Sequence, residues 1–515
     1  MKNTARTRGK RALALLAAFA LTGVGVLGAA AAANAAPSFG NIDPDADGSI
    51  IIHKHEHQTV TPPVEGNADG TGALITTPGV ADVTFTVYEL LYNGNPVDLT
   101  VPSAWDNLGD LVVSADGSTI TGATGYTRGA VVGTGKTDAS GLTTVDVSTI
   151  GAYVVVETAA PPTVTDTAAP FIVTIPFPYE DGWLYDVNVY PKNGTSTVEK
   201  TINPQDPNGV TLGSVVQFPV TVKVPSLAAG RDFTSFDVVD VLDPKLTPKP
   251  AAAGDAGAGV LSVVLDGTVV PASYYTVAVS GQNVSVTFDV SNAAVQTLLK
   301  GAATKNLVVT FQGVVNAVGE IVNDATGFIN NPGHDSGITS NEVTTNWGDA
   351  KILKIDSATP STPLAGAKFQ VYNAEAPYAA SCDAAVKTGS ALSVGTADTF
   401  TTGADGVATI AGLFVSDSVN PTINAAQRCY VVVEIEAPAG FITPTGAAAE
   451  FPLTVKTGST ASGTYDLTVK NQQQDVPNLP LTGGSGTIAL IVGGVGLLAV
   501  AGGLFLVRRR AAAKH

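Results

Sequence analysis

Basic side chains are scarce in the body of this chain. Nine of the 27 Lys and Arg residues lie in residues 1–36 and 479–515, which hold no Asp or Glu, so the body between them carries 18 basic against 44 acidic residues, a net charge of −26. This charge argues against nucleic acid and anionic membrane surfaces as partners. It suits a soluble extracellular protein that must not aggregate.

Motifs of hydrolytic and metal chemistry are also missing. The chain has no Gly-x-Ser-x-Gly nucleophile elbow, no paired-His metal motif and no convincing triad. His53, His55 and His57 alternate on one face of an expected strand, which is compatible with a metal site, but no second cluster of ligands accompanies them. We therefore expect an exposed polar face there, with no metal, no cofactor and no enzymatic activity.

Long helical apolar periodicity is absent outside the two terminal segments. Short alternating runs recur instead, and in residues 216–224 four valines and a phenylalanine alternate with other residues. A period of two predicts half-buried strands. A body of about 450 residues suggests two to four domains at roughly 100–200 residues each. We expect an all-β protein built of sandwiches.

The amino-terminal segment is not expected to belong to a domain. Five basic residues precede an apolar stretch at residues 12–28, and the small-x-small pattern Ala33-Asn34-Ala35 follows. This order predicts a secretory signal peptide over residues 1–36 that is removed on export.

The carboxyl-terminal segment combines a short motif, an apolar run and a basic end. The motif is Leu479-Pro480-Leu481-Thr482-Gly483, and it precedes an uncharged run at residues 487–507 and then three arginines. The run is long enough to cross a bilayer as a helix, and the arginines hold its end in the cytoplasm. The alternative is an ordinary single-pass tail anchor. The segment resembles the cell-wall sorting signal of Gram-positive surface proteins, in which a membrane-bound sortase cuts between Thr and Gly, here Thr482 and Gly483.

Cysteine occurs twice, as Cys382 and Cys429. In an exported protein, a lone pair within one domain predicts a disulfide. It would close a loop of nearly fifty residues and stabilise the fold by about 4 kcal/mol in the chain-entropy model. The alternative, a reactive thiol, lacks a nearby His.

Two parts of the body repeat each other. Residues 85–88 match 369–372, and residues 153–157 match 430–434. A Lys within an apolar strand opens each copy, and an Asn closes it 36 or 37 residues after the shared Glu. The residues concerned are Lys54, Glu157 and Asn193 in the first copy and Lys354, Glu434 and Asn471 in the second. One domain type therefore occurs twice, on either side of a different middle segment.

The Glu of each repeat lies among valines in a strand that should be buried. Burial favours a protonated carboxyl and a neutral amine. A neutral Lys facing an Asn carboxamide polarised by a carboxylic acid is a nucleophile facing an electrophile. Loss of ammonia leaves a Lys–Asn amide, with the Glu as proton shuttle. The alternative is a buried Lys–Glu ion pair with the Asn as hydrogen-bond partner.

These motifs have a family resemblance. Residues 430–441 resemble the E-box of Gram-positive major pilins, residues 364–369 resemble the first strands of their CnaB-type immunoglobulin-like domains, and residues 183–192 fit the pilin motif. The match covers essentially the whole chain and is closest to fimbrial shaft subunits of the SpaA-like kind. It implies that Lys192 accepts the sortase-held Thr482 of the next subunit. Because Lys192 and Asn193 are adjacent, one should face out where the other faces in.

The middle segment resembles a CnaA-type domain, which uses Asp where the CnaB type uses Glu. The resemblance implies a third Lys–Asn bond, between Lys200 and Asn346, with Asp240 as the acid and Asp237 as the other candidate.

The sequence therefore predicts three tandem immunoglobulin-like β-sandwich domains in the order CnaB–CnaA–CnaB. Their expected bounds are 37–193, 194–347 and 348–478, between the signal peptide (1–36) and the sorting signal (479–515). The resemblance implies a wall-anchored, secreted shaft subunit of a covalent pilus that supports adhesion. Its expected partners are identical subunits head to tail, a pilus-type sortase, tip and base pilins and peptidoglycan. The rival reading is a monomeric wall-anchored adhesin, which would need no pilin motif. The adhesion ligand stays open.

Overall fold

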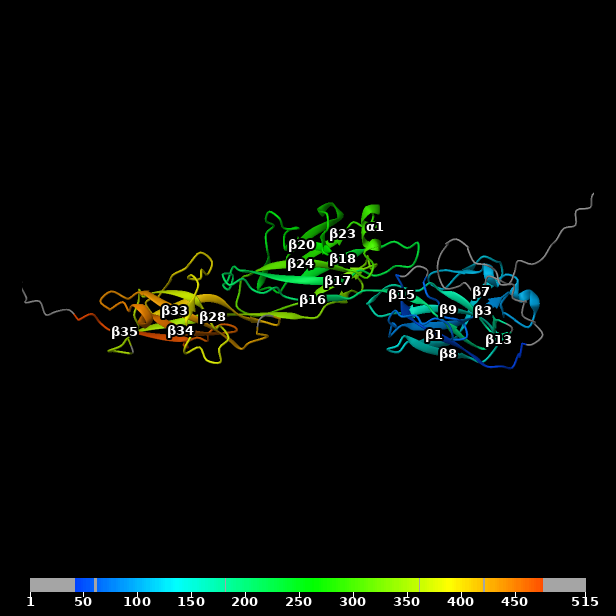
Figure 1. Ribbon diagram of the computed structural model, residues 1–515, viewed down its shortest axis with the longest axis horizontal. Coiled ribbons are helices and arrows are strands. Elements are labelled where there is room, and N and C mark those ends of the chain that lie inside the picture. Colours follow the sequence, from blue (N-terminus) through cyan, green and yellow to red (C-terminus); the bar gives the residue numbers. More distant parts are fainter. Residues whose placement is uncertain (1–41, 60–62, 181, 361, 420–421, 476–515) are drawn as a thin grey trace, which may run out of the picture.

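The structure is a computed structural model that describes residues 42–59, 63–180, 182–360, 362–419 and 422–475. The expected signal peptide and sorting signal lie outside these residues. Figure 1 shows the strands gathered into three groups in a row. We call strands β1–β15 the first domain, β16–β27 the middle domain and β28–β35 the third domain. None of the helices within the described ranges has the length and apolar character to cross a bilayer.

The first domain packs two larger sheets against each other. One has the order β14-β1-β8 and the other β11-β9-β3-β7, and a small sheet of order β10-β15-β2 extends beside them. The strands are β1 (Gly48–His53), β2 (His55–Glu56), β3 (Thr84–Tyr92), β4 (Asn95–Pro96), β5 (Val112–Val113), β6 (Ile120–Thr121), β7 (Tyr126–Lys136), β8 (Leu142–Val147), β9 (Gly151–Ala159), β10 (Val164–Asp166), β11 (Phe171–Ile175), β12 (Phe177–Tyr179), β13 (Gly182–Leu184), β14 (Asp186–Val189) and β15 (Lys192–Thr195).

Strand β9 reads as a continuous apolar run because both of its faces are buried. Tyr153 and Val155 point into the core shared with β1 and β3. Val154 and Val156 point the other way, into a second cluster that contains Trp105. Glu157 follows at the end of this buried stretch.

The middle domain is a sandwich of two antiparallel sheets. One runs β16-β17-β24-β20-β21 and the other β22-β23-β18-β26-β27. Its elements are β16 (Val198–Lys200), β17 (Val215–Lys223), β18 (Phe236–Val241), β19 (Leu246–Pro248), β20 (Val260–Leu265), β21 (Thr268–Val269), β22 (Tyr275–Ser280), β23 (Asn283–Phe288), α1 (Ala293–Gly301), β24 (Asn306–Val315), β25 (Gly319–Asn323), β26 (Ala325–Ile329) and β27 (Ile338–Thr339).

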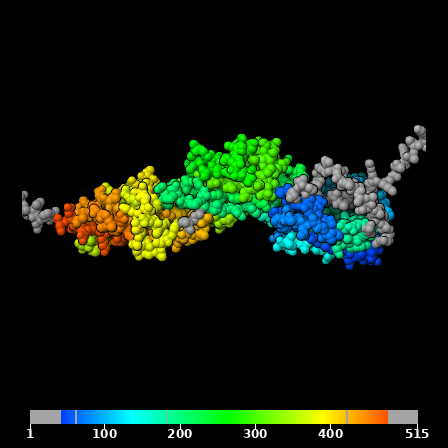
Figure 2. Space-filling view, in the orientation of Figure 1, coloured from blue at the N-terminus to red at the C-terminus, as the bar shows by residue number. Residues whose placement is uncertain are grey.

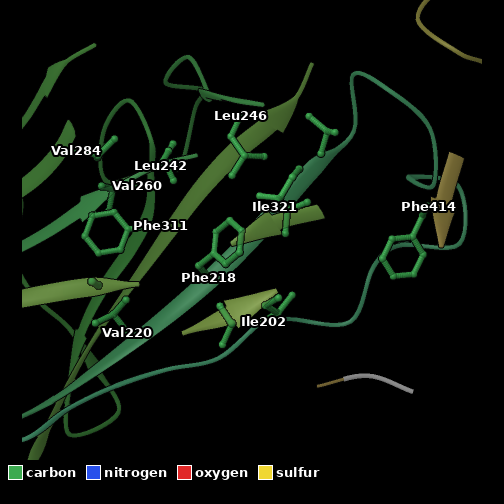
Figure 3. Packing of buried hydrophobic residues seen from close by; sticks show 14 of the residues in the cluster. Ile202, Phe218, Val220, Leu242, Leu246, Val260, Val284, Phe311, Ile321 and Phe414 are labelled. Atoms are coloured by element: carbon green, nitrogen blue, oxygen red, sulfur yellow. The ribbon is translucent and has the colours of Figure 1, made fainter. Parts of the chain in front are cut away.

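The alternation expected over residues 216–224 is confirmed in β17. Val216, Phe218 and Val220 are at most 1% exposed, whereas Gln217 and Pro219 between them are only half-buried. Figure 3 shows the apolar side chains of this core lying between the strands, with Phe414 further along, toward the third domain. The all-β sandwich architecture is therefore as predicted.

The third domain repeats the two-sheet arrangement. One sheet has the order β25-β28-β32 with β35 beside β28, and the other runs β30-β29-β33-β34. Its strands are β28 (Val343–Asp356), β29 (Lys368–Ala374), β30 (Lys387–Thr388), β31 (Phe400–Thr401), β32 (Val407–Asp417), β33 (Gln427–Glu436), β34 (Glu450–Lys456) and β35 (Leu467–Asn471). Cys382 and Cys429 form the predicted disulfide, with their Cα atoms 5.2 Å apart.

The middle and third domains share one apolar core and one strand. Strand β28 pairs with β25 of the middle domain at its start and with β35 of the third domain at its end. It therefore passes without a break through the expected boundary between residues 347 and 348. Trp347, with no exposed surface, lies edge-on to Phe414 across this junction. Two backbone hydrogen bonds add a second connection: the N–H of Phe414 donates to the carbonyl of Val210, and the N–H of Leu212 donates to the carbonyl of Gly412.

The junction between the first and middle domains is polar instead. Lys223 Nζ lies 3.2 Å from Glu56 Oε2, and Arg231 pairs with Asp166. Asn330 Nδ2 donates to the carbonyl of Thr165 at 2.8 Å. Figure 2 shows the first domain (blue and cyan) as a body set against one end of the middle domain (green). Charged pairs, rather than a shared core, hold these two domains together.

Candidate cross-linking sites and linkage lysine

The first domain brings together the three residues that its repeat predicted. Lys54 lies between β1 and β2, Glu157 lies in β9 and Asn193 lies in β15, so the three come from segments far apart in the chain. Lys54 Nζ donates to Asn193 Oδ1 and, at 3.0 Å, to Glu157 Oε2, while Asn193 Nδ2 donates to Glu157 Oε1 at 2.9 Å. Lys54 and Asn193 have no exposed surface, and the Glu157 side chain is 1% exposed.

The third domain repeats this closed triangle. Lys354 Nζ donates to Asn471 Oδ1 and, at 3.1 Å, to Glu434 Oε2, and Asn471 Nδ2 donates to Glu434 Oε1 at 2.7 Å. Lys354 lies in β28 and Asn471 at the end of β35, which run parallel and side by side. A covalent bond between them would tie the first and last strands of this domain.

Burial sets the protonation of these groups. It lowers the pKa of Lys54 to about 8, against the opposing effect of the Glu157 carboxylate. Burial likewise lowers the pKa of Lys354 and raises the pKa of Glu434, so the two shifts move that pair toward its neutral form. The Phe85 ring, whose centroid lies 5.6 Å from Lys54 Nζ, adds an apolar wall to the first site.

The middle domain corrects one predicted partner. Lys200 Nζ meets Asp240 Oδ2 at 2.6 Å, as expected, but its next contact is the carbonyl of Asp324 at 2.8 Å. Asn346 instead donates to Ser416 Oγ on β32 at 3.3 Å. The amide beside the pair belongs to Asn323, whose Nδ2 lies 3.4 Å from Asp240 Oδ2.

Strand register explains why Asn323 takes this place. Asp240 of β18 lies opposite Ala325 of β26, so the residues just before Ala325 come beside the acid. Asn323 ends β25 two residues after the buried Ile321, just as Asn471 ends β35 two residues after the buried Val469. That spacing was a usable signal, and the sequence interpretation missed it.

In the middle site, burial shifts the pKa values of the lysine and the acid in the same directions as in the third domain. Burial lowers the pKa of Lys200 and raises the pKa of Asp240. Within the described ranges, Asn323 Oδ1 and Asp240 Oδ1 are buried without a hydrogen-bond partner. Asp237, the other candidate acid, points to the opposite face of β18, where its Oδ2 lies 2.9 Å from His334 Nε2.

Lys192 begins β15, directly before the buried Asn193. Pro191 separates β14 from β15, and β15 then pairs in parallel with β2. Lys192 is half-buried, whereas Asn193 faces Lys54 inside the domain. Burial lowers the pKa of the Lys192 amine, which favours its neutral, nucleophilic form.

The three alternating histidines have separate partners. His53 Nε2 contacts Asn188 Oδ1 at 2.8 Å, His55 Nδ1 contacts the carbonyl of Thr77 at 2.9 Å, and His57 Nε2 lies 3.4 Å from Asp166 Oδ2. This face is half-buried and not exposed, contrary to the sequence expectation. Neighbouring segments cover part of this face.

Comparison with known proteins assigns the parts of the chain. Residues 45–194 match the model of the Gram-positive pilin subunit D1, N-terminal domain, residues 348–473 match a prealbumin-like fold domain, and residues 471–513 match the LPXTG cell wall anchor motif. The anchor match includes Thr482 and Gly483, which lie outside the described residues.

Two fimbrial subunits are similar over their whole lengths. The type 2 fimbrial subunit of Actinomyces naeslundii is 35% identical over 99% of this chain and 98% of its own. The type 1 fimbrial subunit of Actinomyces viscosus is 30% identical over 100% of this chain and 99% of its own. Among solved structures, the full-length major pilin SpaD from Corynebacterium diphtheriae shares the fold, with a TM-score of 0.65 and 24% identity over 85% of this chain and 99% of that one.

Proposed function

Since the chain belongs to the family of Gram-positive fimbrial subunits, we propose that a sortase joins its copies from Lys192 of one subunit to Thr482 of the next. The chain is a wall-anchored fimbrial protein of the pilus shaft, in a family of structural proteins rather than enzymes. On this proposal it is a sortase substrate without catalytic turnover, with tip and base pilins and peptidoglycan as its other partners.

The observation that carries the proposal is the position of Lys192. It shares β15 with Asn193, so a cross-link at Asn193 fixes the strand that presents the linkage lysine. Its burial favours the amine form that attacks the Thr482 acyl-enzyme. Joining the end of one elongated subunit to the first domain of the next stacks subunits head to tail.

We further propose three internal Lys–Asn bonds, each beside an acid. They are Lys54–Asn193 with Glu157, Lys200–Asn323 with Asp240, and Lys354–Asn471 with Glu434. In each, the Lys nitrogen attacks the Asn side-chain carbon, a C–N bond forms and the amide nitrogen leaves as ammonia. The protonated acid gives its proton to the leaving nitrogen and takes one from the attacking amine, so it ends unchanged.

The linkage is tested by Lys192→Ala in cells that carry the pilus-type sortase. We expect loss of the high-molecular-weight ladder on gels, with export and folding intact, because the proposal makes the Lys192 amine the acceptor of the Thr482 acyl group. Lys136→Ala is the matched control, since Lys136 is a lysine of the same domain whose side chain is 61% exposed. Linkage mapping should recover a Lys192–Thr482 peptide.

A ladder that persists in the Lys192→Ala strain would show that another lysine is the acceptor. The rival function, a monomeric wall-anchored adhesin, makes the opposite prediction: wild-type cells would carry single subunits only.

A further inference from the structure

One peptide group connects the first-domain triad to the middle domain. The carbonyl of Thr167 accepts from Arg231 Nη1 of the middle domain at 3.0 Å. The N–H of the same peptide group, on Ala168, donates to Glu157 Oε2 at 3.1 Å. Glu157 Oε2 is also the atom that meets Lys54. Because a peptide group is planar, the bond that orients its carbonyl also orients its N–H.

The residue before this peptide group is fixed to the same partner. Asp166 is 5% exposed, and its carboxylate accepts from Arg231 Nη1 and, at 2.7 Å, from the backbone N–H of Ala228. Both donors belong to the middle domain. His57 of the first domain approaches the same carboxylate. The middle domain thus holds the side chain of Asp166 and the carbonyl of Thr167 at once.

The third domain lacks this connection. In the part of the chain that the structure describes, the Glu434 carboxylate accepts from Lys354 and Asn471, and no backbone N–H donates to it. Its triangle is complete within its own domain. The first-domain acid alone is held by a peptide group that a neighbouring domain orients.

We propose that Arg231 and Asp166 are positioning residues for the cross-linking reaction in the first domain. Docking of the middle domain orients the Thr167–Ala168 peptide, which sets Glu157 against Lys54 and Asn193. The bond in the first domain therefore forms only after the middle domain has folded and docked. This inference rests on the proposed function, since it takes the Lys54–Asn193 bond as the product.

The chain connectivity suggests why the first-domain bond should form after docking. Asn193 and Lys192 are consecutive in β15, and β15 leads directly into the middle domain at β16. A bond that closes after docking locks the linkage strand only in a subunit whose two domains are correctly placed.

The test follows both bonds in the same full-length molecules. The starting material is unfolded chain in which the bonds have not yet formed. It is refolded from denaturant, and tryptic peptides are quantified over time. The proteins compared are wild type, Arg231→Ala, Asp166→Asn and Arg231→Lys. Lys354–Asn471 is the internal reference for folding. Lys223→Ala is the matched control, because it removes another ion pair of the same junction without touching the Thr167–Ala168 peptide.

We expect Arg231→Ala and Asp166→Asn to slow formation of the Lys54–Asn193 peptide at least several-fold, with the third-domain bond unchanged. Lys223→Ala should match wild type. Arg231→Lys should recover most of the rate, because an ammonium also donates several hydrogen bonds. Wild-type rates in Arg231→Ala, equal slowing by Lys223→Ala, or no recovery in Arg231→Lys would each overturn the inference. A wild-type first domain without the bond would overturn the proposed cross-link itself.

Discussion

At the scale of single residues, the reactive unit is a pair that shares one mobile proton. A neutral Lys beside a protonated acid carries as many protons as an ammonium beside a carboxylate. The balance between these two forms does not depend on pH while the pair keeps that proton. Burial lowers the pKa of the lysine in all three domains, and in the middle and third domains it also raises the pKa of the acid, so there it disfavours both charges.

The first pH prediction follows from Lys54. Its pKa is lowered from an ordinary 10.5 to about 8, so above about pH 8 the pair with Glu157 loses its shared proton. The acid then has no proton to deliver to the leaving nitrogen. We expect the rate of Lys54–Asn193 formation during refolding to be flat between about pH 6 and 7.5 and to fall above about 8, as measured by mass spectrometry. A rate that keeps rising above pH 8 would mean that the free amine alone limits the reaction.

At the scale of secondary-structure elements, period-two patterns predicted the strands well because one-sided burial is a local property. The pattern in β17 could be recognised this way, and the internal repeat gave the Lys, Glu and Asn positions of the first and third domains. The partner of Lys200 could not, because it depends on which strand lies beside Asp240. The register between β18 and β26 determines which residues lie beside Asp240, and it places Asn323 there rather than Asn346.

The prediction that the three histidines form an exposed face was wrong for the same reason. Alternation shows that His53, His55 and His57 share a face, but not what packs over that face. In the structure a backbone carbonyl, an amide and a buried carboxylate occupy it. These contacts come from residues far away in the sequence, so the local pattern cannot predict them.

Glu434→Ala tests the link between β28 and β35. Without the acid, the third-domain bond should not form, so this domain should keep one ammonia that wild type loses. Lys354 would be left buried without its ionisable partner, at a cost of about 3–5 kcal/mol. We expect lower thermal and protease resistance, checked by intact mass, calorimetry and limited proteolysis.

Glu436→Ala serves as the control for this variant. Glu436 lies on β33, the strand of Glu434, and its side chain is 56% exposed and paired with Lys368. Its removal should change neither mass loss nor stability measurably, as is usual for surface pairs. An unchanged mass deficit in Glu434→Ala would rule out Glu434 as the proton shuttle.

At the scale of the whole molecule, the two domain junctions differ in kind. The middle and third domains share β28 and a continuous apolar core, whereas the first domain has clusters of its own and a charged junction. Buried apolar contacts couple domains strongly, whereas partly buried ion pairs without a shared core add little net stability. The molecule therefore has two cooperative units rather than three.

Trp347→Ala tests this division by calorimetry. We expect one transition for the first domain and a joint transition for the other two. Loss of the fully buried Trp347 should cost about 3–5 kcal/mol and lower only the joint transition. Trp105→Ala, in a first-domain core, should lower only the other transition. Separate shifts of the middle and third domains in Trp347→Ala would contradict the shared unit.

The continuous strand β28 also bears on the mechanics of a fibre made from such subunits. Bending across the middle and third domains must distort a strand and a packed core, whereas bending at the first junction rearranges ion pairs and hydrogen bonds. Each repeat is then a stiff segment followed by one compliant joint. With the proposed cross-links formed, such a shaft resists stretching through covalent bonds yet curves at regular intervals.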